Sequence, residues 1–210
     1  FTLTETKTIA WYQAAVTAPD ALRQRAAWAL SQILVLGEEG SVQTNAAERF
    51  LIYYDIFIRH AFGNFRDILG EVTYNPCMGD YLTYIDNREA NPDLGTFPDE
   101  NYARAVMQLF TIGLWMLNQD GTHIIDDKGR SIPTYDNDDI FEFSKIFTGL
   151  RKQYTGRSGN GPTGNVEIKS GNFIDPLRMQ SSWHDFSTKT LLDGTILGPY
   201  SDNNAGAFAE

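Results

Sequence analysis

The chain has 210 residues, 42% of them hydrophobic and 21% charged, which suffices to bury a core without disulfides or metals and excludes a disordered tail. Its 27 acidic and 17 basic residues give a net charge of -10, so binding of nucleic acid or anionic lipid is not expected as a main role. The single cysteine, Cys77, excludes an internal disulfide and a cysteine-based zinc site, and no apolar run is long enough to span a membrane.

Helical signals begin at the N-terminus. Residues 1–16 form the first predicted helix, and because the chain starts inside it without an initiator Met, we expect a processed piece of a longer protein. Residues 17–20 and 96–99 are two copies of one helix-start signal: a capping Thr, a Pro in the first turn and an Asp. The first signal predicts a helix that ends at Gly37, since apolar residues follow it at steps of three and four.

The next helices follow from periodicity and capping residues. An aromatic stripe predicts a helix over residues 46–61. We interpret three of its aromatic residues as core: Tyr53, Tyr54 and Phe57. Asn64 and Asn75 are placed to cap two shorter helices, and Cys77 is expected to be a small buried residue in the second of them.

The second start signal opens a helix that we expect to be central. Its apolar stripe runs as far as Gly113, and Leu109 is predicted to lie in the core. A last helix is predicted over residues 136–149, with acidic residues in its first turn.

Two stretches favour β-structure instead. Gly-containing turns at 120–121 and 128–129 flank a β-prone run at 122–125, which predicts a small hairpin between helices. A second hairpin is predicted over residues 190–197, and the Gly, Ser and Thr of residues 155–165 indicate a long loop.

These elements predict a mainly α fold: an irregular multi-helix assembly with one or two small β-hairpins and a long C-terminal wrapping segment. Residues 1–150 are expected to form a helical body, and residues 151–210 a loop-rich segment docked on it, within one domain overall. Trp183 and Phe186 are expected to dock in apolar grooves, because aromatic residues are too frequent here for a free linker.

The densest cluster of candidate site residues lies at the start of the central helix. Glu100, Arg104 and Gln108 follow one line at steps of four, with Asn101 beside them, so they could bind an anionic or polyhydroxylated ligand. We expect Arg104 to be partly buried and to bond outside its own helix. The alternative is a local ion pair with acids placed favourably in the first turn.

A second candidate is His184 with Asp185 and the nearby Lys189. The imidazole could act as a base or metal ligand, and the ammonium could hold a negative group. A metal-dependent phosphohydrolase would complete such a His-Asp pair with an earlier His, either His60 or His123, and a later Asp, Asp193. The alternative, favoured because the pair follows no helical stripe, is that His184 anchors a loop by hydrogen bonds.

The acidic residues around the first predicted hairpin form a third candidate. Asp120, Asp126 and Asp127 could hold calcium, although the spacing fails the EF-hand template; the alternative is a solvated acidic loop. No other cofactor is required by any pattern in the sequence.

Several of these motifs together resemble the domain-of-unknown-function 1800 family. The similarity covers residues 25–197 in the family's order, and its most distinctive part is the motif at 98–113. The other matching segments are 25–33, 61–66, 75–82, 117–121, 132–135, 147–149 and 184–190.

The resemblance implies a mostly helical, exported protein of roughly double this length, of which this chain is the front half. An extracellular or periplasmic location is therefore expected, without an established activity. Relatives commonly have Glu where this chain has Ala105, and Trp where it has Leu150. If that Glu is catalytic in relatives, this chain lacks it.

Two functions remain open, and so does the question of whether the protein is an enzyme. The first is an interaction or assembly module whose partners are other protein chains or the rest of a longer protein. The second is a hydrolase-type enzyme for a polyhydroxylated or phosphorylated substrate, with Glu100, Arg104, His184 and Asp185 lining one cleft. Asn101, Gln108 and Lys189 would then bind the substrate.

Overall fold

The computed structural model of the protein describes residues 3–37, 47–153 and 172–200. Over these residues the fold is mainly helical with two small two-stranded sheets, which confirms the predicted fold class. None of the helices described is both long and apolar enough to cross a bilayer. The loop predicted over residues 155–165 lies outside the described residues.

The chain folds into two compact units, and each combines two stretches of sequence. Unit 1 contains residues 1–85 and 151–178, and unit 2 contains residues 86–150 and 179–210. The chain leaves unit 2 along β1 (Leu150–Arg151) and returns along β2 (Arg178–Met179), and these two strands pair. The C-terminal part of the chain therefore contributes to both units instead of forming one added segment.

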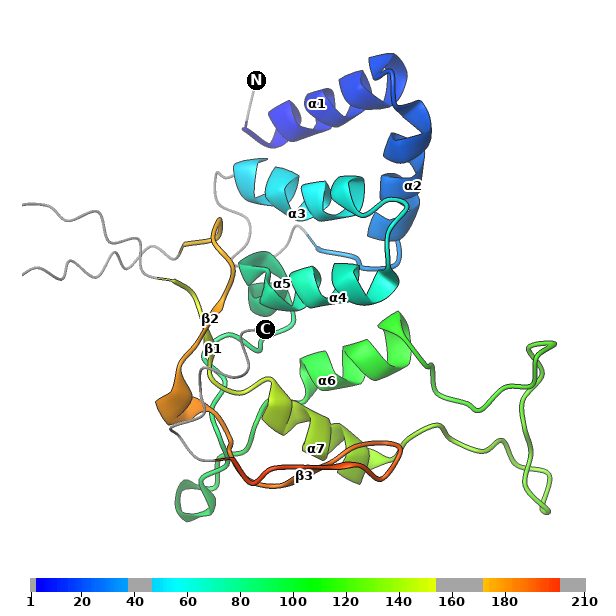
Figure 1. Cartoon of the computed structure of the whole chain (residues 1–210), viewed down its shortest axis with the longest axis vertical. Coiled ribbons are helices and arrows are strands. Elements are labelled where there is room, and N and C mark those ends of the chain that lie inside the picture. Colours follow the sequence, from blue (N-terminus) through cyan, green and yellow to red (C-terminus); the bar gives the residue numbers. More distant parts are fainter. Residues whose placement is uncertain (1–2, 38–46, 154–171, 201–210) are drawn as a thin grey trace, which may run out of the picture. The chain divides into compact units, whose positions relative to one another are not determined.

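Unit 1 is built from helices (Figure 1). They are α1 (Leu3–Thr17), α2 (Ala21–Ser31), α3 (Ala47–Arg59), α4 (Phe65–Tyr74) and α5 (Pro76–Tyr81). The first three contact one another in every pair, and α3 also contacts α4 and α5. Helix α3 buries Tyr53, Ile56 and Phe57, whereas Tyr54 is only half-buried, so the prediction that all three aromatic residues are core is wrong for Tyr54.

Two asparagines start helices of unit 1 as predicted. The side chain of Asn64 accepts a hydrogen bond of 2.9 Å from the backbone N–H of Arg66 at the start of α4. Asn75 does the same for Cys77 at the start of α5, also at 2.9 Å. Asn75 and Cys77 are both buried, so this cap also satisfies an amide that water does not reach.

The two Thr start signals are wrong in their details. Thr17 is the last residue of α1, and its hydroxyl donates to the carbonyl of Gln13, so α2 begins only after Asp20. Thr96 exchanges two backbone hydrogen bonds with Asn91, at 2.9 and 3.1 Å, and this pairing keeps it out of the following helix.

Unit 2 contains shorter elements. They are η2 (Pro92–Leu94), α6 (Asn101–Ala105), η3 (Val106–Phe110), α7 (Asn137–Ile146), η4 (Ser181–Trp183), β3 (Lys189–Thr190) and β4 (Ile196–Leu197). Its core packs Ala103 and Met107 against Ile140 of α7, with Tyr135, Phe143 and Phe147 around them. Strands β3 and β4 form the predicted second hairpin, with Lys189 opposite Leu197.

The central helix is shorter than predicted because it widens into a π-helical turn. After α6, the Thr111 hydroxyl bonds to the carbonyl of Val106, five residues earlier, and the Gly113 N–H bonds to that of Met107. The buried side of this segment carries Ala103, Met107 and Phe110, which differs from the predicted stripe. Leu109, predicted to be in the core, is 66% exposed, whereas Met107 is 2% exposed.

Where the first hairpin was predicted, the chain forms three short extended segments instead of two. Residues 112–134, which contain them, are here called the arm. The two predicted glycine turns, at Gly121 and Gly129, join three short extended runs. Three backbone hydrogen bonds close a ring between them: Met116 to Ile132, Ile132 to Ile124, and Ile124 to Met116, at 2.8–3.0 Å from N to O. Figure 1 shows the arm extending from the ends of η3 and α7.

Candidate functional site

His184 is buried where the chain leaves η4. Its Nδ1 lies 2.8 Å from the carbonyl oxygen of Thr148 at the end of α7, so this nitrogen carries the proton and donates it. The Thr148 hydroxyl donates to the carbonyl of Lys145 (2.7 Å) and accepts a hydrogen bond of 2.8 Å from the backbone N–H of Asp185. His184 and Asp185 are thus tied to the last turn of α7 through one buried threonine.

Gly149 follows this threonine and makes the close approach possible. Its φ of +81° lies in the left-handed region, and an added Cβ would lie 2.8–3.0 Å from atoms of Met179, Gln180 and His184. The Gln180 N–H donates to the Gly149 carbonyl at 2.7 Å. The Phe-Thr-Gly and His-Asp segments, far apart in sequence, are therefore two halves of one contact.

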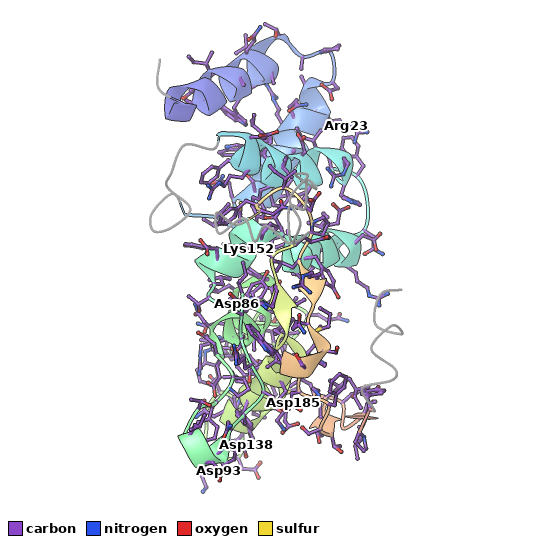
Figure 2. The ribbon with its side chains drawn as sticks, turned by 90° about the vertical axis from the view of Figure 1, so that its left-hand side faces the viewer. Arg23, Asp86, Asp93, Asp138, Lys152 and Asp185 are labelled. Carbon is purple, nitrogen blue, oxygen red and sulfur yellow. The ribbon has the colours of Figure 1, made fainter. Side chains whose placement is uncertain are left out.

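Asp185 and Lys189 form the second part of the network, and Asp185 is labelled in Figure 2. The Lys189 Nζ, with its side chain 5% exposed, lies 2.5 Å from the Asp185 carbonyl oxygen and 3.0 Å from that of Ser187. It is 3.5 Å from the Asp185 carboxylate, which also accepts hydrogen bonds from the N–H (2.8 Å) and hydroxyl (2.5 Å) of Ser187. The buried ammonium thus binds mainly backbone carbonyls and closes a tight turn.

These surroundings shift three pKa values. Burial lowers the pKa of His184, although its hydrogen bond to the Thr148 carbonyl opposes this effect. Burial also lowers the pKa of Lys189, against the attraction of Asp185. Burial would raise the pKa of Asp185, but the two hydrogen bonds from Ser187 and the charge of Lys189 outweigh it, and the pKa is lowered.

Helix α7 holds the β3–β4 hairpin through a hydrogen bond from the hairpin backbone to Glu142. The Glu142 carboxylate accepts a hydrogen bond of 3.1 Å from the Thr190 N–H and one of 2.5 Å from Lys145.

The two aromatic residues that were expected to dock, Trp183 and Phe186, are half-buried in unit 2. The guanidinium of Arg88 lies 3.5 Å from the ring centre of Trp183, and Phe186 meets the His184 ring edge-on. This geometry favours the anchoring role of His184 over a role as a base.

The other predicted cluster lies on the surface of unit 2. Arg104 donates to the Glu100 carboxylate at 3.2 Å, and within the described part of the chain neither side chain makes another hydrogen bond or ion pair. Arg104 is exposed, so the expectation of a partly buried guanidinium bonded outside its helix is wrong. The reason is that α6 buries the face that carries Tyr102, Ala103 and Ala105.

The two predicted binding residues of this cluster do not join the pair. Asn101 is exposed, and its N–H donates to the Asp99 carboxylate. Gln108 is half-buried inside the π-helical turn, which removes it from the line through Glu100 and Arg104. The structure therefore gathers His184, Asp185 and Lys189 in one network and leaves the Glu100–Arg104 ion pair outside it.

The acidic residues of the arm bind neighbouring groups of the same turns. Asp120 accepts hydrogen bonds from the N–H and hydroxyl of Thr122, and one carboxylate oxygen of Asp126 accepts two hydrogen bonds from the Arg130 guanidinium. Among the described residues, no group of three or more His, Cys, Asp or Glu is arranged to hold a metal. Calcium binding by Asp120, Asp126 or Asp127 stays a prediction.

The arm carries a surface that the sequence reasoning missed. Six large apolar side chains on it are 40–60% exposed: Ile112, Leu114, Trp115, Met116, Leu117 and Ile125. Trp115 stacks on His123 with 5.9 Å between ring centres, and His123 bonds to the Ser131 hydroxyl at 2.8 Å. The available signal was the unbroken apolar run from residue 114 to 117, which follows neither the helical nor the strand period.

Comparison with known proteins places the chain in a family. Residues 2–208 match the family model described as "Protein of unknown function (DUF1800)". No curated protein and no solved structure gives a significant match.

Proposed function

The chain belongs to the DUF1800 family of proteins of unknown function, and from this premise we propose that it is an interaction module whose arm binds a protein partner. The observation that carries the proposal is the group of six exposed apolar side chains on the arm. Scattered exposed apolar residues are ordinary, but six of them on one short hydrogen-bonded scaffold are typical of a protein interface. Trp115 supplies the aromatic anchor that such interfaces favour.

The partner's chemistry follows from charge. The chain has a net charge of -10, and the acids of the arm (Asp120, Asp126 and Asp127) outnumber its two exposed basic residues, Lys128 and Arg130. A second copy would bring two acidic surfaces together, which is unfavourable. The partner is therefore another protein chain, with an apolar contact surface surrounded by Lys and Arg.

Site-specific photocrosslinking tests this proposal with the full chain in an extract of its source organism. A photoreactive residue at Leu117 should yield one discrete crosslinked partner with a basic contact surface, identified by mass spectrometry. The same residue at Leu94, which is 75% exposed outside the arm, is the control and should not yield it.

A double variant makes the test quantitative. Trp115→Ser with Leu117→Ser should lower the affinity for the identified partner by at least about tenfold, because it removes the apolar centre of the contact. Leu94→Ser with Ile196→Ser removes two apolar residues elsewhere in unit 2 that are even more exposed (75% and 65%) and should leave the affinity unchanged. Crosslinking of the arm to a second copy only, or equal effects of both double variants, would overturn the proposal.

The hydrolase-type alternative has less support, because among the described residues the side chains of Glu100 and Arg104 bond only to each other. In addition, backbone carbonyls occupy the Nδ1 of His184 and the Nζ of Lys189, and Ser187 occupies the Asp185 carboxylate. We also propose that the module works outside the cytoplasm, on the basis of its family resemblance. Fractionation of cells that produce the full-length protein tests this location.

A further inference from the structure

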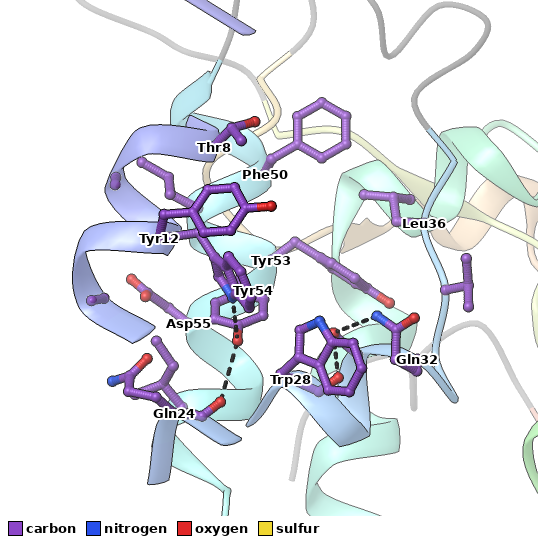
Figure 3. A pocket seen from close by; sticks show the side chains of 17 residues that line it. Thr8, Tyr12, Gln24, Trp28, Gln32, Leu36, Phe50, Tyr53, Tyr54 and Asp55 are labelled. Atoms are coloured by element: carbon purple, nitrogen blue, oxygen red, sulfur yellow. Dashed lines mark hydrogen bonds between the residues drawn. The ribbon is translucent and has the colours of Figure 1, made fainter. Parts of the chain in front are cut away.

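Unit 1 has an open cavity of about 550 Å³ between α1, α2 and α3 (Figure 3). This volume lies within the range of small-molecule binding sites. Six aromatic side chains line it: Trp11, Tyr12, Trp28, Phe50, Tyr53 and Tyr54. None of the residues discussed for the arm or for the His184 network contributes to it, so it is an independent feature of the molecule.

The back wall of the cavity is rigid. The indole N–H of Trp11 donates to the Tyr54 hydroxyl at 3.0 Å, which in turn lies 3.5 Å from the Gln24 carbonyl oxygen. The Tyr53 hydroxyl donates to the Leu34 carbonyl at 2.7 Å. These polar groups are satisfied within the protein, so the rings are held in place before any ligand arrives, which reduces the entropy lost on binding.

The open side presents two aromatic faces. Tyr12 is 61% exposed and Trp28 is 49% exposed, although both are large apolar side chains. Figure 3 shows them on different sides of the cavity, with Gln32 beside Trp28. Exposed rings at the mouth of a preformed cavity give a flat ligand a surface on which to stack.

The polar groups of the lining are almost all neutral. Thr8, Gln24, Ser31 and Gln32 supply hydroxyls and amides, and Asp55 supplies the one carboxylate. The described lining contains no Lys or Arg, which a phosphate or carboxylate ligand would need. The cavity is therefore suited to a ligand with apolar flat faces and several neutral hydroxyls.

We propose that this cavity binds a neutral pyranose sugar. The C–H groups on one face of a pyranose ring are weakly positive and pack on the negative face of an aromatic ring, here Trp28 or Tyr12. The hydroxyls at the ring's edge would bond to the side chains of Gln32, Gln24 and Asp55. A quaternary ammonium ion is the rival ligand, since aromatic rings and a carboxylate attract it, but it would leave the amides and hydroxyls unused.

Binding to the full chain is measured by tryptophan fluorescence and calorimetry with three neutral probes: maltotriose, cellotriose and triacetylchitotriose. We expect at least one to bind with saturable change in emission. Trp28→Ala should weaken that binding at least about tenfold, whereas Trp28→Phe should retain most of it because the ring face remains. Trp115→Ala is the matched control, since Trp115 is 40% exposed but lies in unit 2, and it should not change the affinity.

Gln32→Ala is a second variant, chosen because Gln32 is exposed and its loss should not disturb folding. It should also weaken sugar binding. Each probe is titrated from 20 times the protein concentration up to about 50 mM. The proposal is overturned if none of the three probes binds in this range, or if binding survives both Trp28→Ala and Gln32→Ala. Choline binding that is lost in Asp55→Asn, without sugar binding, would identify the site as one for cations and overturn the proposal as well.

Discussion

At the scale of single residues, Gly149 is the most tightly constrained position of the His184 network. Its backbone is left-handed (φ +81°) and its surroundings leave no space for a methyl group. Gly149→Ala should lower the free energy of unfolding by more than about 2 kcal/mol, from backbone strain of about 1 kcal/mol plus the steric contact. Urea denaturation measures the change.

Gly121→Ala is the matched control. Gly121 has nearly the same φ (+82°), but nothing lies within 4 Å of an added Cβ. It should therefore show the backbone strain alone, about 1 kcal/mol. Equal losses at the two positions would mean that the contact around Gly149 is not tight.

The buried His184 makes stability depend on pH. Because burial lowers its pKa in the folded protein below the ordinary 6.5, the unfolded chain takes up a proton that the folded chain resists. The stability due to this group is complete above about pH 6.5 and is lost as the pH falls toward the lower pKa of the folded protein. Asp185, whose pKa is lowered, contributes to the same trend only at more acidic pH.

Urea denaturation between pH 7.5 and 5 tests this dependence. His184→Asn keeps an N–H donor near the Thr148 carbonyl but cannot be protonated, so the slope of stability against pH in this window should become shallower. His123→Asn, which replaces an exposed histidine of the arm, is the control. If His184→Asn leaves the slope of stability against pH unchanged, the pH dependence does not come from His184.

Short-range signals in the sequence bear on some of the candidate site residues. The pattern around His184 follows no helical stripe, which favoured an anchoring role, and the geometry agrees. The exposure of Arg104 was not predictable, because it depends on which face of α6 packs on α7, and residue spacing alone does not decide that. The hydrogen-bond partner of His184 could not be predicted either, since Thr148 is 36 residues away in the chain.

At the scale of elements, the π-helical turn η3 decides which side of the central segment is buried. Met107→Ala should cost about 2–5 kcal/mol, because a 2% exposed side chain would leave a cavity. Leu109→Ala should cost less than about 0.5 kcal/mol, because Leu109 is 66% exposed. Denaturant titration of the two variants measures the difference, and a larger loss for Leu109→Ala would show that the turn is placed wrongly.

The helices whose first residues could be located from sequence are those with local caps. Asn64, Asn75 and Asp136 each bond to an N–H two or three residues ahead, so their effect is visible in a short window of sequence. The Thr96 signal failed because a non-helical pairing with Asn91 competes for the same backbone groups. The π-helical turn left no sequence signal that period analysis detects, since its apolar residues also fit an ordinary helix.

At the scale of the whole molecule, each unit has its own buried core, so we expect them to unfold with separate midpoints. The four tryptophans are divided evenly: Trp11 and Trp28 are in unit 1, and Trp115 and Trp183 are in unit 2. Replacing one pair by Phe makes fluorescence report on one unit only. Denaturant titration of the two reporter chains then gives a midpoint for each unit.

Core variants placed in these reporter chains make the comparison decisive. Met107→Ala should lower the midpoint reported by Trp115 and Trp183 and leave that of Trp11 and Trp28 unchanged, because Met107 belongs to the core of unit 2. Phe57→Leu, in the core of unit 1, should have the reverse effect, since Phe57 packs edge-on against Tyr53 and Tyr54. If either variant moves both midpoints equally, the chain unfolds as one cooperative body, and the exchange of segments at residues 150 and 179 couples the two cores.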